Sequence, residues 1–71
     1  MARYIVATRR DSREDAPSAL DAITGEPGVK VLQASDPHMV TIEADPEAAA
    51  RLEAKLGGTH FVEPEIRRGL H

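Results

Sequence analysis

Residues 40–58, VTIEADPEAAARLEAKLGG, contain the junction that decides the fold. Residues 40–44 alternate apolar and polar side chains with period two, which predicts a strand with one face on a core. Asp45 is a good helix N-cap, and Pro46 suits the first helical position, where no amide partner is lost. Apolar residues then recur at helical spacing until the glycine pair at 57–58. The sequence therefore predicts a strand that leads directly into an amphipathic helix.

The segments on either side of this junction have equally clear patterns. Upstream, YIVAT and VKVLQ are rich in β-branched and aromatic residues, and downstream THFVE has the same character before Pro64 stops it. Between the first two, APSALDAI has helical apolar spacing, with Pro17 in its first turn and Gly25 as its cap; a start nearer Ser12 is the alternative. The expected strands are residues 4–8, 29–33, 40–44 and 59–63, and the expected helices are residues 16–23 and 46–56.

The expected order is strand, helix, strand, strand, helix, strand. Two helices on one face of a four-stranded antiparallel sheet bury the apolar side of every element, which predicts a ferredoxin-like α+β fold, βαββαβ. We expect the 71 residues to form one domain, 1–71, with 66–71 as an extended C-terminal tail. The chain leaves the second sheet face open. Since strands 4–8 and 29–33 carry apolar residues at both parities, this face is either a docking surface or an ordinary surface with scattered apolar residues.

Composition excludes several classes of function. Twelve acidic against nine basic residues give a net charge of −3, the wrong sign for binding a phosphate backbone, so we expect no nucleic-acid partner. The chain has no Cys, and its three His lack ligand-like spacing, so we expect neither a metal nor a cofactor. No apolar stretch approaches the ~20 residues that span a bilayer. Without a leader after Met1 we expect a cytoplasmic protein, or a secreted one if a leader has been removed.

The sequence also argues against an enzyme. Its Ser residues lie where Ser acts as a cap, and a domain this small has little room for a water-excluding pocket around the acid pair Glu63 and Glu65. The two acids, separated by Pro64, are better suited to cap helix N-termini of another protein, which present unpaired amides and a positive dipole. The tail after them is either a segment that adds to a partner or a frayed terminus.

Several separated segments, in order, resemble the subtilisin-type propeptide family, also called the peptidase inhibitor I9 family. The resemblance runs from residue 4 to residue 71. It rests on the opening Tyr4-Ile5-Val6, on Gly28-Val29-Lys30-Val31, on Val40-Thr41-Ile42-Glu43-Ala44, on Leu52 in the second helix, and on the closing His60-Phe61-Val62-Glu63.

The resemblance implies an inhibitor or folding chaperone of a subtilisin-like serine protease, bound through the open sheet face. By this resemblance Glu63 and Glu65 cap two helices of the protease. The tail residues Arg68, Gly69, Leu70 and His71 would occupy successive subsites of the cleft, with His71 nearest the catalytic serine. Pro64 between the acids and a terminal His in place of a large apolar residue depart from the family pattern.

Other readings of the sequence stay open. The protein either stands alone, as the start at Met1 favours, or is excised from a precursor. The main alternative function is a ferredoxin-like interaction or dimerisation module that is not directed at proteases; a small-ligand regulatory domain ranks lower, because no ligand loop stands out. We expect a monomer when unbound, or a weak homodimer.

Overall fold

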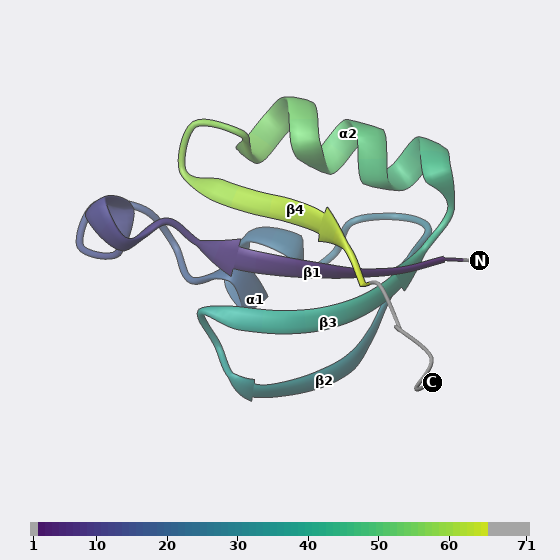
Figure 1. Cartoon of the computed structure of the whole chain (residues 1–71), viewed down its shortest axis with the longest axis horizontal. Coiled ribbons are helices and arrows are strands. Elements are labelled where there is room, and N and C mark those ends of the chain that lie inside the picture. The colour runs from purple at the N-terminus through teal and green to yellow at the C-terminus, as the bar shows by residue number, and fades with distance from the viewer. Residues whose placement is uncertain (1, 66–71) are drawn as a thin grey trace, which may run out of the picture.

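The computed structural model describes residues 2–65, which form an α+β sandwich of one sheet and two helices (Figure 1). Within these residues four antiparallel strands pair in the order β2-β3-β1-β4. The predicted ferredoxin-like fold is confirmed. The strands are β1 (Ala2–Thr8), β2 (Val29–Asp36), β3 (Met39–Ala44) and β4 (His60–Pro64). The two α-helices are α1 (Ala19–Ile23) and α2 (Pro46–Leu56), and a short 3₁₀ turn, η1 (Arg10–Ser12), lies between β1 and α1.

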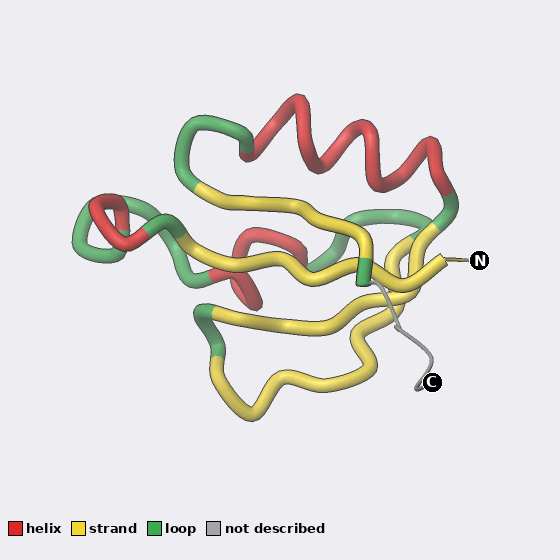
Figure 2. The backbone as a smooth tube through the Cα atoms, viewed as in Figure 1, coloured by secondary structure: helices red, strands yellow, loops and turns green. Residues whose placement is uncertain are grey.

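The first helix is shorter than its apolar spacing predicts, and the expected start at residue 16 or at Ser12 is wrong. Figure 2 shows a short helix at the position of α1. Ser18 is the N-cap, and its Oγ accepts a hydrogen bond from the Asp21 amide at 3.2 Å. Pro17 therefore lies before the helix and disfavours helical geometry at Ala16. Because Ser18 caps the helix and Pro17 precedes the cap, α1 begins at Ala19, three residues after the expected start at residue 16.

The second helix begins and ends where the sequence predicts. Asp45 is its N-cap residue, although the side chain makes no capping hydrogen bond, and Gly57 follows its last turn. One side of α2 is buried against the sheet through Ala48, Ala49, Leu52 and Leu56. The apolar residues of this 11-residue helix recur at regular helical spacing, so the tertiary contacts agree with the local prediction of its bounds.

The core lies between the helices and one face of the sheet. Val6, Val40 and Ile42 are fully buried, and Ile23 from α1 and Leu52 from α2 pack against them. Because strand side chains alternate in direction, these residues fix which face of β1 and β3 meets the helices. Tyr4, Leu20, Ala22, Val29, Ala34 and Val62 are partly buried at the margin of the core.

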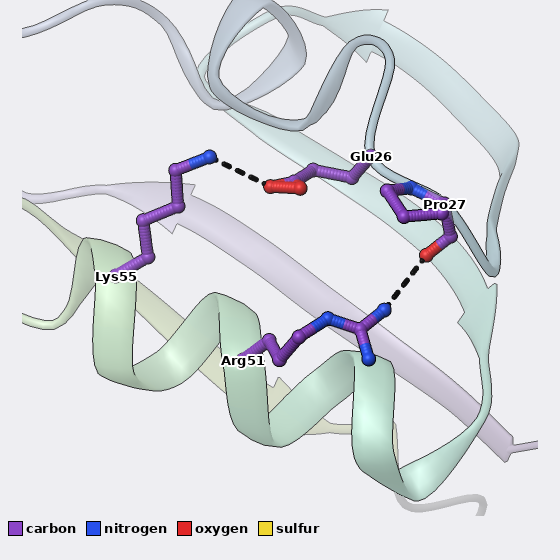
Figure 3. A network of polar contacts seen from close by, with 4 residues as sticks. All are labelled: Glu26, Pro27, Arg51 and Lys55. Carbon is purple, nitrogen blue, oxygen red and sulfur yellow. Dashed lines mark hydrogen bonds and ion pairs between the residues drawn. The ribbon is translucent and has the colours of Figure 1, made fainter.

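A polar latch ties the loop before β2 to α2 (Figure 3). Lys55 Nζ lies 2.8 Å from Glu26 Oε1, and Arg51 Nη2 donates to the Pro27 carbonyl oxygen at 3.1 Å. In the same loop Gly28 has a φ of 79°, and a Cβ at that position would lie 3.3 Å from Ala48 Cβ. The latch and the glycine together hold the loop close to the helix.

Candidate functional site

The open face is the side of the sheet opposite the helices. On β1 and β3 the buried residues are even-numbered, so their odd-numbered neighbours project from the open face. The pairing register arranges these side chains in rows across the sheet. Each row is given in the order β4, β1, β3, β2. The Phe61 row is Phe61, Ala7, Met39 and Asp36, and the Glu63 row is Glu63, Ile5, Thr41 and Gln33. The Arg3 row is Glu65, which directly follows β4, then Arg3, Glu43 and Lys30.

The Phe61 row is largely apolar and exposed. Met39 is 57% exposed and Phe61 43%, and Ala7 lies between them. Ile5, in the next row, is half-buried. The other two exposed large apolar side chains of residues 2–65, Val31 and Leu32, lie on the edge strand β2. Exposed apolar side chains on one sheet face form a surface that another molecule can cover.

The acid pair lies on this same face. Glu63 pairs with Ile5 across the β1–β4 ladder, and the Glu65 amide donates to the Arg3 carbonyl oxygen at 2.9 Å. Glu65 directly follows the end of β4, and its hydrogen bond to Arg3 continues the pairing by one residue, so both carboxylates point to the open face. Glu65 also lies 3.9 Å from the Arg3 guanidinium. Pro64 is compatible with this pairing because β4 is an edge strand, whose outer side needs no ladder hydrogen bond.

A shallow hollow of about 300 Å³ opens where the edge strand β4 meets the end of α2. Arg9 lines it, and its Nη2 and Nε donate to the Gly57 carbonyl oxygen at 2.7 and 3.2 Å. The same guanidinium stacks on Phe61, and Glu63 contributes an acid to the rim. The hollow is thus continuous with the open face through Phe61 and Glu63.

The two histidines that the structure describes are both engaged in hydrogen bonds. His60 is buried, with Nδ1 2.7 Å from Thr59 Oγ1 and Nε2 2.9 Å from the Pro17 carbonyl oxygen. His38 Nδ1 lies 3.1 Å from Thr8 Oγ1. Among residues 2–65 no group of three or more His, Asp or Glu side chains gathers in a way that could hold a metal ion.

The structure brings together only part of the candidate site. Glu63 and Glu65 share the open face, whereas Arg68, Gly69, Leu70 and His71 lie outside the described residues. Sequence reasoning missed the stacking of Arg9 on Phe61 and the alternating charges of the Arg3 row. The period-two pattern of residues 40–44 already places Glu43 opposite the core, but its neighbours across the sheet depend on register, which no pattern in one strand reveals.

No known protein family, curated protein or solved structure matches this chain.

In the part of the chain that the structure describes, no helix combines the length and the apolar character needed to cross a membrane.

Proposed function

We propose that this chain is an inhibitor or folding chaperone of a subtilisin-like serine protease, which it contacts with its open face. The observation that carries the proposal is the arrangement of β4. Phe61 and Glu63 of β4, together with Glu65 directly after it, project to the open face. An apolar anchor and two acids therefore come from one short segment.

Each part of this arrangement has a separate physical role in the proposal. Burial of Phe61 and Met39 against the protease removes exposed apolar surface from water, at roughly 25 cal/mol per Å². Glu63 and Glu65 accept hydrogen bonds from unpaired amides at helix N-termini of the protease, where the helix dipole also favours negative charge. The Arg3 contact to Glu65 is long, at 3.9 Å, and leaves that carboxylate available for new donors.

In the proposal the segment from Arg68 to His71 lies in the substrate cleft like a cleaved product. The hydrogen bond from the Glu65 amide to Arg3 anchors the chain just before this segment. When the folded domain is already docked, binding of this segment in the cleft loses less entropy than binding of a free peptide. The same docked surface stabilises the folded protease by mass action, which is how one interaction supports both inhibition and folding.

The test is a titration of the full chain into a subtilisin-type protease that cleaves a chromogenic peptide. We expect competitive inhibition that is lost when Arg67 to His71 are deleted. Circular dichroism of the truncated chain checks that the domain itself is unchanged. If several such proteases are unaffected by the full chain, the proposal is wrong, and an interaction module directed at other partners replaces it.

A further inference from the structure

The Arg3 row carries charges that alternate in sign from Glu65, the residue directly after β4, across β1 and β3 to β2. In order towards β2 the residues are Glu65, Arg3, Glu43 and Lys30. Arg3 and Glu43 are ladder partners, as are Glu43 and Lys30, and Glu65 joins the row through its amide hydrogen bond to the Arg3 carbonyl oxygen. The row therefore reads negative, positive, negative, positive. Reversed end to end, it presents the opposite charge at every position, so it is complementary to its own reversed copy.

We propose that two copies of this chain associate through their open faces, about a two-fold axis that runs parallel to the strands between β1 and β3. These two strands lie in the middle of the sheet (Figure 1). Rotation about this axis sets each row against the same row of the second copy. It places β4 opposite β2 of the second copy and β1 opposite β3 of the second copy. Such an interface is isologous, so each contact occurs twice.

The charge match selects this axis. It places Arg3 opposite Glu43 of the second copy and Lys30 opposite Glu65 of the second copy. An in-plane axis perpendicular to the strands would instead exchange the outer rows and set Phe61 against Glu65 and Met39 against Glu43. That arrangement pairs only Lys30 with Asp36 and leaves Arg3, Glu43 and Glu65 facing apolar side chains without a partner, which costs desolvation. The proposed axis leaves only Asp36 facing an apolar side chain.

The same axis brings the apolar side chains together. Ala7 falls opposite Met39 of the second copy, and the reciprocal pair lies beside it across the axis. Met39, the most exposed large apolar residue in the described chain, is thereby covered. Phe61 falls opposite Asp36 at the rim, where a carboxylate remains hydrated.

The size of the face predicts a weak dimer. Strands about 4.8 Å apart and same-face residues about 6.8 Å apart give four strands and three rows a footprint of roughly 400 Å² per copy. A stable complex buries about 800 Å² per partner. We therefore expect dissociation at low concentration, and the dimer excludes any other partner from the same face. The inference does not depend on the proposed function, since it concerns the chain alone.

Analytical ultracentrifugation of the full chain from about 10 μM to about 1 mM, the range suited to a weak complex, tests the inference. We expect the average mass to rise from 7.7 kDa towards twice that value. Arg3→Glu and Glu43→Arg each set like charges opposite one another twice, so each variant alone stays monomeric where the unmodified chain dimerises. An equimolar mixture of the two variants restores opposite charges at both contacts, so it dimerises.

The control is Glu47→Arg, which makes the same charge change on the exposed side of α2 and leaves the dimer intact. Circular dichroism shows whether each variant is folded. An unmodified chain that stays monomeric over the whole range overturns the proposal, whatever the variants do. Single variants that still dimerise overturn it as well, because another interface would then hold the copies together. Mixed variants that stay monomeric although each is folded also overturn it, because Arg3 would then not face Glu43 of the second copy.

Discussion

The guanidinium of Arg9 stacks on the ring of Phe61, with Arg9 Cζ 4.2 Å from the ring centroid. The same group donates two hydrogen bonds to the Gly57 carbonyl oxygen, at the C-terminal end of α2. Arg9 follows β1, so one side chain joins β1, α2 and β4 and fixes Phe61 on the open face. Its charge also lies where a helix dipole favours a cation.

Replacement of this side chain should destabilise the domain. We expect Arg9→Ala to lower the free energy of unfolding by about 1–2 kcal/mol, because charge-assisted hydrogen bonds and a cation–π contact are lost together. Urea denaturation measures the change. Arg10→Ala is the matched control, since Arg10 is exposed in η1, and we expect an effect within about 0.5 kcal/mol. Equal effects of the two variants would show that the Arg9 contacts contribute nothing to stability.

The buried His60 gives a second prediction. A carbonyl oxygen only accepts, so His60 Nε2 donates to Pro17, and in the neutral ring Nδ1 accepts from the Thr59 hydroxyl. His60→Phe keeps an aromatic ring but removes both hydrogen bonds and leaves the Pro17 carbonyl oxygen and the Thr59 hydroxyl without this partner. We expect thermal unfolding to show a loss of about 1–3 kcal/mol in the free energy of unfolding. His38→Phe is the comparison, because the His38 ring is only half-buried and water can replace its hydrogen bond to Thr8 Oγ1. A larger loss for His38→Phe would contradict the argument.

Two glycines with similar backbone angles give a third prediction. Gly25 and Gly28 have φ values of 84° and 79°, so alanine at either position is strained by about 1–2 kcal/mol. At Gly25 a Cβ meets nothing within 4 Å, whereas at Gly28 it lies 3.3 Å from Ala48 Cβ. We expect Gly28→Ala to lower the unfolding free energy more than Gly25→Ala, measured in parallel urea titrations. The opposite order would mean that the loop moves away from α2 easily.

The acid pair gives a prediction on binding. If Glu63 and Glu65 cap helices of the protease, the double variant Glu63→Ala with Glu65→Ala should weaken binding by roughly 1–3 kcal/mol, by analogy with the loss of caps and charged hydrogen bonds. Isothermal titration calorimetry gives the change. The double variant Glu14→Ala with Asp15→Ala removes the same charge from the exposed loop between η1 and α1 and should leave affinity unchanged. Unchanged affinity in the first variant would rule out a capping role.

The sequence predicts the architecture well because most elements have strong local signals. The alternation in residues 40–44, the Asp-Pro start of α2 and its glycine end each agree with the tertiary structure. The start of α1 could not be predicted, since the apolar spacing of residues 16–23 continues through Pro17 while the Ser18 cap begins a new helix. Two local signals competed there, and the backbone restriction imposed by proline decided the outcome.

The open face was predictable in character but not in detail. Period two within each strand shows which side chains share a face, and the presence of apolar residues there follows directly. The rows across the face depend on strand order and register. Arg3 and Lys30 lie 27 positions apart in the sequence and flank Glu43 only because of the ladder pairing. Similarly, Arg51 Nη2 donates to the Pro27 carbonyl oxygen 24 positions away, a contact that spacing along the helix does not reveal.

The claim that the open face is the protease-docking surface is tested most directly by the inhibition constant of Phe61→Asp against a subtilisin-type protease. Ala50→Asp, on the exposed side of α2, introduces the same charge away from that face. We predict that Phe61→Asp raises the inhibition constant by on the order of 10- to 100-fold, as expected when an aromatic anchor is lost, while Ala50→Asp inhibits like the unmodified chain. Equal inhibition by both variants would contradict the account.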